Sequence, residues 1–231
     1  MNFCIFATLA ACFISVTATH GALYTVRNVS FPPSDSSGVE DSLGRTFRNG
    51  TTAGAAFPTG SGVSAGPGIV AFGVFNRNDA NLSSLNKNDL LAAFQMFGAS
   101  MTFLTNGTLG NRGLFASTQG PVTVAGSVFD GNPIYLLAGN GSIFADSSEF
   151  LVLRLDTSSF AASDDLIPTP TTVTITPANS TVLVGQLVAN VQTANTDSSN
   201  TLGWQMVPEP SVAILLPLAG VIALRRRRQA L

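Results

Sequence analysis

Cysteine, histidine and charge are scarce in this sequence. The two cysteines, Cys4 and Cys12, both lie in an apolar run at the N-terminus, and the one histidine is His20. The chain beyond residue 22 therefore has no disulfide, and burial of a core alone must stabilise it. Because it also lacks thiolate and imidazole ligands, we expect no zinc or copper site and no cofactor.

Charged residues make up only 10% of the chain, and acidic residues outnumber basic ones between residues 23 and 206. Proteins that bind nucleic acid neutralise phosphates with clustered lysine and arginine. This range has no such cluster, so we expect no nucleic-acid partner. Its polar residues are mainly Ser, Thr, Asn and Gly, a composition found in exported surface proteins and also in flexible linkers.

One stretch has the spacing of a catalytic motif. Gly62-Val63-Ser64-Ala65-Gly66 matches the nucleophile elbow, but the elbow needs a histidine base. The only histidine, His20, is next to an expected N-terminal cleavage site. The stretch is therefore predicted to be a glycine-rich loop, and we expect no catalytic residue and no enzymatic activity.

The sequence also contains possible oxygen ligands for a metal and neighbouring carboxylates. Two polar stretches carry atoms that calcium prefers: Asn76, Asn78, Asp79 and Asn81, and then Asn195 and Asp197. Neither stretch follows the EF-hand spacing, so both are predicted to be solvated turns. Neighbouring carboxylates that glycoside hydrolysis could use are Asp146 with Glu149 and Asp164 with Asp165. Their spacing alone assigns them no role.

The N-terminus has the layout of an export signal. Residues 3–16 form an apolar run, followed by the small residues of Val16-Thr17-Ala18, so residues 1–22 are predicted to be a signal peptide cleaved between Ala18 and Ala22. A lipoprotein signal at Leu9-Ala10-Ala11-Cys12 is the alternative. It is disfavoured because few residues precede Cys12 and none of them is basic.

The chain from 23 to 160 alternates short apolar segments with Gly, Asn, Pro and Ser. This pattern predicts strands separated by turns. The predicted strands are 23–29, 68–75, 101–104, 122–129, 133–138 and 150–155. The turn residues 130–133 are expected to join 122–129 and 133–138 as a hairpin. We therefore predict a mainly β fold, a single antiparallel β-sandwich-like domain.

One segment near 86–97 has helical rather than strand periodicity. Its apolar residues are Leu90, Leu91, Phe94 and Phe97, which lie on one face of a helix, with Asn86 or Asn88 at its start and Gly98 at its end. The sequence therefore predicts one short amphipathic helix within the β domain.

Residues 161–206 are rich in Thr, Asn and Pro. Two interpretations remain open for them, a partly ordered stalk or the final strands of the domain. Residues 202–206 are expected to form a last strand that returns to the core. Trp204 in that strand is more consistent with a core residue than with a platform for a sugar.

The C-terminus combines Val207-Pro208-Glu209-Pro210, an uncharged run and Arg225-Arg226-Arg227-Arg228. The thirteen residues 212–224 would span about 20 Å as a helix, and a count from Val207 extends this to about 27 Å, close to the roughly 30 Å of a bilayer core. Pro217 would kink such a helix. The arginines are expected to remain in the cytoplasm, so the preceding domain lies outside.

This arrangement closely resembles the PEP-CTERM sorting signal of Gram-negative bacteria. The resemblance covers about the last twenty-five residues, and it implies recognition by a membrane peptidase called exosortase and cleavage at or near the motif. It assigns Pro208, Glu209 and Pro210 to recognition, Arg225 to Arg228 to stop-transfer, and residues 212–224 to a transient anchor. The anchor residues named in that segment are Val212, Leu215, Leu216, Pro217 and Leu224. The order of the preceding domain is also similar to that of many PEP-CTERM proteins, which implies no activity.

Together these features predict an exported surface or extracellular-matrix protein, associated with exopolysaccharide or biofilm. Its expected partners are an exosortase-type peptidase, the inner membrane in passing, and extracellular polysaccharide. The alternative is a carbohydrate-binding module, which would expose aromatic side chains on one sheet face. A carboxylate-based hydrolase is a third hypothesis and would need two acidic side chains in one cleft.

Overall fold

The computed structural model describes residues 21–29, 36–57, 62–104, 112–162, 169–191 and 201–209. This part of the chain is mainly β, as predicted, and most of its strand pairs are antiparallel. The predicted signal peptide and the predicted sorting helix lie outside the described residues. No helix within the described ranges is long and apolar enough to cross a membrane.

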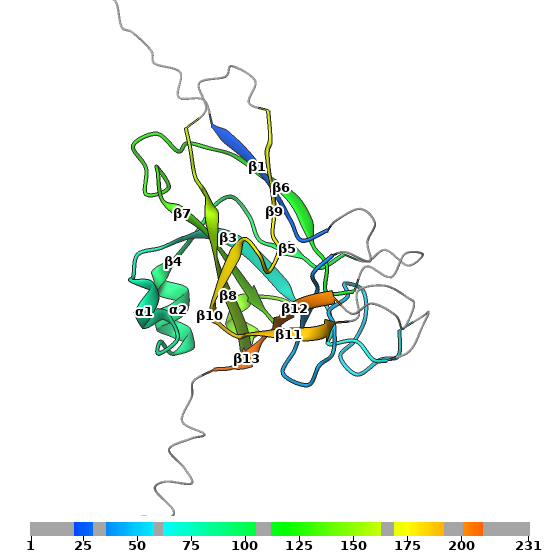
Figure 1. Ribbon diagram of the computed structural model, residues 1–231. Helices are drawn as coiled ribbons and strands as arrows, with labels where there is room; N and C mark the ends of the chain where they lie inside the picture. Colours follow the sequence, from blue (N-terminus) through cyan, green and yellow to red (C-terminus); the bar gives the residue numbers. More distant parts are fainter. Residues whose placement is uncertain are drawn as a thin grey trace, which may run out of the picture.

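A seven-stranded sheet runs through the centre of the molecule (Figure 1). Its main path has the order β10-β8-β7-β3-β4, with β13 also paired to β8 and β5 to β3. The strands are β3 (Ile69–Phe75), β4 (Phe94–Met96), β5 (Met101–Thr102), β7 (Pro133–Gly139), β8 (Glu149–Ser159), β10 (Ser180–Val184) and β13 (Val207–Pro208). Every pairing in this sheet is antiparallel.

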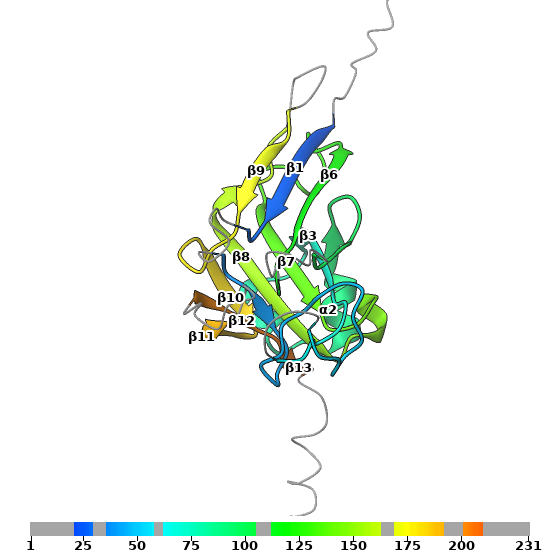
Figure 2. The ribbon, with the colours of Figure 1, turned by 90° about the vertical axis from the view of Figure 1, so that its right-hand side faces the viewer.

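Two three-stranded sheets complete the β structure. One has the order β6-β1-β9 and the other the order β11-β12-β2. Their strands are β1 (Ala22–Arg27), β6 (Ala116–Val122), β9 (Thr171–Thr174), β2 (Val39–Glu40), β11 (Gln186–Val191) and β12 (Thr201–Gln205). Each contains one parallel pair, β1 with β9 and β12 with β2, which the antiparallel prediction did not include. In Figure 2 β1, β6 and β9 lie side by side at one end of the molecule.

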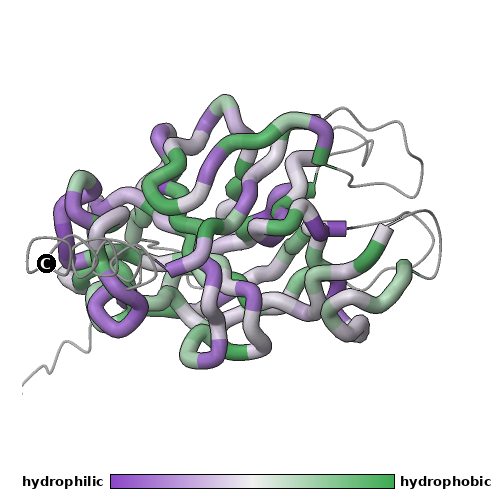
Figure 3. The backbone as a smooth tube through the Cα atoms, turned by 90° about the horizontal axis from the view of Figure 1, so that it is seen from below, coloured by the Kyte–Doolittle hydropathy of each residue, from purple (hydrophilic) through white to green (hydrophobic). Residues whose placement is uncertain are grey.

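The central sheet is buried on both faces. Along β7 the residues Ile134, Leu136 and Ala138 join the main core, whereas Tyr135 and Leu137 join a second core. The main core includes residues of β1 and β9. The second includes Leu82 and Leu90, from the helices α1 (Asp79–Leu82) and α2 (Lys87–Ala93). Because side chains alternate across a strand, β7 separates these two cores. Figure 3 shows hydrophobic and hydrophilic residues interspersed along the backbone.

The main core is centred on aromatic rings. Phe97 stacks on Phe160 at 4.8 Å and on Phe72 at 5.6 Å, measured between ring centroids. Tyr24 and Phe129 meet the same ring edge-on, at 5.4 and 5.2 Å. These edge-to-face and stacked geometries are the favoured ones for aromatic pairs, so Phe97 joins segments that are far apart in the sequence.

The helix predicted near 86–97 is shorter than expected. Of the two caps predicted, Asn86 is the one used, since its side chain accepts a hydrogen bond from the Asp89 N–H at 3.0 Å. α2 nevertheless ends at Ala93, and Phe94 is extended and pairs with Phe75 of β3. Residues 94–96 therefore form the strand β4, which pairs with β3. A second short helix, α1, was not predicted.

The predicted strand 122–129 and its hairpin are wrong. The strand in this region is β6, which ends at Val122, and the residues up to Asn132 form turns. Asp130 Oδ2 accepts a hydrogen bond from the Gly126 N–H at 2.9 Å, and the Ser127 N–H donates to the Val124 carbonyl at 2.9 Å. These local bonds satisfy the backbone without a ladder. β7 pairs instead with β3 and β8.

The described parts of 161–206 are final strands of the domain. β9 pairs with β1, β10 with β8, and β12 with both β11 and β2. The expected strand at 202–206 corresponds to β12, and the side chain of Trp204 is fully buried in the main core. A stalk is therefore not needed to account for the residues described in this range.

Replacing Phe97 by Ala tests the aromatic centre of the main core. We expect a loss of about 3–5 kcal/mol in the free energy of unfolding, the usual cost of removing a buried Phe side chain. Urea denaturation measures this loss, with the fluorescence of Trp204, the only tryptophan, as the signal of unfolding. Leu43→Ala, at a side chain that is 72% exposed, is the control and should change stability by less than about 0.5 kcal/mol. Equal losses for the two variants would contradict the assignment.

Candidate functional site

The predicted sorting motif is described only in its first part. Pro208 and Glu209 are described, and Pro210 is not. The other residues assigned to sorting lie outside the described residues: Val212, Leu215, Leu216, Pro217, Leu224, Arg225, Arg226, Arg227 and Arg228. The structure therefore places only Val207, Pro208 and Glu209 of the predicted sorting signal.

The beginning of the motif is a strand of the central sheet. In β13, Val207 pairs with Phe150 and Pro208 with Glu149. Proline has no N–H to donate, and the next backbone donor, the N–H of Glu209, bonds to the Ser148 carbonyl at 3.0 Å. Figure 1 shows β13 beside β8, at the opposite end of the molecule from the start of β1.

An ion pair holds the acidic residue of the motif. The Nζ of Lys87 lies 3.2 Å from Glu209 Oε1, and the two side chains are 27% and 20% exposed. The same Nζ donates to the carbonyls of Ala145 and Ser147, both at 3.1 Å. Lys87 is the first residue of α2 and the only lysine in the sequence. Its ammonium therefore links α2, the segment before β8 and Glu209.

The apolar side chain of the segment, Val207, also contacts the domain. Val207 packs against the second core, which includes Leu90 and Phe150. Val207, Pro208 and Glu209 lie across a groove whose other lining residues are Leu82, Leu85, Lys87, Leu90, Phe150 and Val184, and a cavity of only about 10 Å³ remains between the two sides. The segment thus fills the groove.

A separate polar cluster joins α1 to the central sheet. Asp79 accepts hydrogen bonds from the Tyr135 hydroxyl at 2.7 Å and from Arg154 at 2.5 Å. Arg154 also contacts Asp156 at 3.0 Å, and Asp156 accepts from the Thr181 hydroxyl at 2.9 Å. Both carboxylates therefore face the same guanidinium.

In the stretch 76–81, the possible calcium ligands Asn78 and Asp79 make hydrogen bonds within the protein instead. Both oxygens of Asp79 are hydrogen-bonded within the cluster, and the Asn78 side chain caps α1 by accepting from the Ala80 N–H at 3.2 Å. Asn78 thus caps a helix, and Asp79 forms an ion pair with Arg154. Asn195 and Asp197 lie outside the described residues. Among the described residues no group of three or more His, Cys, Asp or Glu could hold a metal ion.

Burial and charge shift two pKa values in this cluster. Burial, and then the hydrogen bond to Asp79, raise the pKa of Tyr135 from 10.0 to about 12. The hydrogen bonds from Arg154 to Asp156 and to Asp79 raise the pKa of that guanidinium. At neutral pH Tyr135 is therefore neutral and Arg154 charged. Their common role is to fix α1 on the sheet.

Ser64, at the nucleophile position of the Gly62–Gly66 motif, makes contacts that give it a structural role. Ser64 is fully buried; its Oγ is 2.7 Å from the Thr51 hydroxyl and accepts a hydrogen bond from the Gly66 N–H at 3.0 Å. Its loop is followed by β3 and not by the helix that a nucleophile elbow requires, and His20 lies outside the described residues. The glycine-rich loop predicted here agrees with this geometry.

The predicted carboxylate pairs do not form a site among the described residues. Glu149 accepts hydrogen bonds from the N–H and the hydroxyl of Ser42, at 2.9 and 2.6 Å. Asp146 is exposed in the short 3-10 helix η2 (Phe144–Asp146). Asp164 and Asp165 lie outside the described residues. The Ser42 contacts give Glu149 a role in holding the loop after β2.

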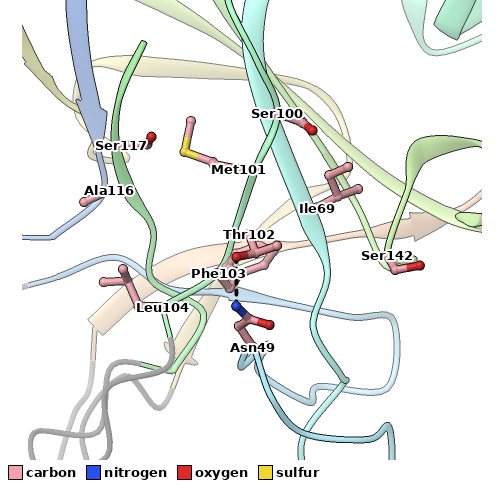
Figure 4. A pocket seen from close by; sticks show the side chains of 10 residues that line it. All are labelled: Asn49, Ile69, Ser100, Met101, Thr102, Phe103, Leu104, Ala116, Ser117 and Ser142. Carbon is pink, nitrogen blue, oxygen red and sulfur yellow. Dashed lines mark hydrogen bonds between the residues drawn. The ribbon is translucent and has the colours of Figure 1, made fainter.

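An open hollow of about 470 Å³ lies beside β5 and β6 (Figure 4). Its lining residues are uncharged: Asn49, Ile69, Ser100, Met101, Thr102, Phe103, Leu104, Ala116, Ser117 and Ser142. Asn49 donates to the Thr102 hydroxyl at 3.0 Å, and Phe103 is only 1% exposed. The hollow therefore offers hydroxyl and amide groups, with no titratable group and no exposed aromatic ring.

Searches of family models, curated proteins and solved structures returned no match for this chain. Functional inference therefore depends on the residues themselves. The sequence gives no indication that Lys87 contacts Glu209, apart from Lys87 being the single lysine.

The raised pKa of Tyr135 makes stability depend on pH in the alkaline range. A phenol whose pKa is higher in the folded chain contributes stability that is complete below pH 10.0, its ordinary value, and is lost as the pH rises through about 12. The free energy of unfolding should fall more steeply between these values in the wild type than in Tyr135→Phe. Urea denaturation at a series of pH values measures both slopes, and equal slopes would rule out the shift.

Proposed function

We propose that the protein is an exported, non-enzymatic surface or extracellular-matrix protein that is sorted and processed through residues 207–231. The observation that carries this proposal is the position of the motif. Its first residues are the last described strand of the folded domain, and Pro210, the uncharged run and the arginines follow directly. The motif thus lies at the junction between a folded domain and a segment with the composition of a membrane anchor.

The arrangement of the ends supports the same proposal. The first strand begins at one end of the molecule and β13 lies at the other (Figure 1). With the arginines in the cytoplasm and the uncharged run in the inner membrane, the β13 end of the domain faces the membrane surface. An exosortase-type peptidase acts there, and cleavage releases the domain toward the cell surface or the extracellular polymer.

In this proposal the domain is sandwich-like, and its role is not catalytic. Support for a sandwich-like domain comes from the burial of the central sheet on both faces. Support for a structural role comes from three acidic side chains, because Asp79 and Asp156 share Arg154 and Glu149 is bound by Ser42.

The carbohydrate-binding alternative lacks a specific supporting observation. Such a module would present aromatic rings on one sheet face. Among the described residues every Phe, Tyr and Trp is buried or half-buried, and the exposed large apolar residues are aliphatic or methionine. We therefore keep the structural role as the proposed function.

Replacing Pro208, Glu209 and Pro210 by alanines tests the sorting proposal. The intact mass of the protein recovered from the envelope and medium of its own host should show that the wild type has lost the arginine tail. The triple variant should keep the tail and remain in the inner membrane. Ser211→Ala, next to the motif, is the control and should be processed like the wild type. If the wild type and the triple variant both keep the tail and fractionate alike, the motif is only a linker before an ordinary anchor.

A further inference from the structure

We propose that the groove beside Lys87 and the start of β8 is a binding site for the chain's own Val207–Glu209 segment, and that it withholds this segment from the processing peptidase. This inference rests on the proposed function, because it concerns the regulation of the same motif. The groove and the peptidase then compete for one short acidic, proline-containing segment.

The groove makes three different kinds of contact with the segment. The backbone is held by pairing with β8 and by the Glu209 N–H bond to the Ser148 carbonyl at 3.0 Å. Val207 packs against the second core. The carboxylate of Glu209 meets the Lys87 ammonium at 3.2 Å. Backbone, apolar and charged features of the segment are therefore all recognised, as expected for a binding site.

These contacts exclude simultaneous binding to an enzyme. Extended peptides commonly bind a partner by adding a strand to it, so that main-chain hydrogen bonds provide affinity and side-chain pockets provide specificity. The N–H of Glu209 is already bonded to the carbonyl of Ser148, just before β8, its carboxylate is paired with Lys87, and the Val207 side chain lies against the core. A peptidase that binds the same segment must first detach it from the domain.

Lys87 is well placed to control this detachment. Its Nζ is held by the carbonyls of Ala145 and Ser147, at 3.1 Å each, independently of Glu209. The positive charge therefore stays at the groove when the segment leaves, and it favours return of the carboxylate. Because β13 has only two residues and its ion pair is partly exposed, opening should be frequent and its control by Lys87 should amount to a few-fold effect.

Hydrogen exchange tests whether the groove binds the segment. In the full chain in detergent micelles, exchange of the Glu209 amide should be about two- to five-fold faster in Lys87→Met than in the wild type, the factor expected for loss of a partly exposed ion pair. Lys87→Arg keeps the charge and should exchange at nearly the wild-type rate. Arg77→Ala removes an exposed positive charge before α1 and is the matched control. Unchanged exchange in Lys87→Met, with native Trp204 fluorescence, would overturn the proposal.

A pulse-chase measurement of processing in the host tests the withholding step. Conversion of precursor to the shortened form should be about two- to five-fold faster in Lys87→Met than in the wild type or Arg77→Ala. A rate equal to or lower than the wild-type rate would show that the groove does not withhold the segment. If neither the wild type nor Lys87→Met is shortened, the proposed function fails, and withholding fails with it. The exchange result then decides separately whether the groove binds the segment.

Discussion

Burial of the central sheet on both faces is the constraint on which the rest of this structure depends. Residues of β7 alternate between an aromatic core and a smaller core under α1 and α2. Because the residues after the predicted signal peptide contain no cysteine, this burial has no covalent support. The β8 strand extends the same surface to Phe150, against which the C-terminal Val207 packs. The position of β13, the last described strand, is thus fixed by the second core.

Two of the ion pairs among the described residues connect separate elements. Arg154 joins β8 to Asp79 of α1, and Lys87 joins α2 to Glu209. Partly exposed ion pairs of this kind contribute little to stability, but they favour one position of the helices and of the terminal strand over others. Glu209 consequently belongs both to the fold and to the proposed sorting motif, and the strength of its attachment determines how often the motif is free.

The strands with a clear apolar pattern were predictable from the sequence. Predicted segments 68–75, 133–138 and 150–155 correspond to β3, β7 and β8, because their side chains must be buried in a sheet that is covered on both faces. β6 was missed because it is a polar, largely exposed edge strand without apolar alternation. The predicted helix was too long because Phe94 satisfies its backbone by pairing with β3, and sequence periodicity does not reveal that competition.

By itself the sequence determined the mainly β character, the lack of cysteine after residue 22, a helix start at Asn86 or Asn88, and the Pro208-Glu209-Pro210 pattern, since these follow from composition, local hydrogen bonding and short-range pattern. Only the tertiary structure decided which strands pair, that Asp79 binds Arg154, and that Glu209 binds Lys87. Those contacts join residues far apart in the chain. A local pattern cannot specify them, because their geometry exists only after the two cores have packed.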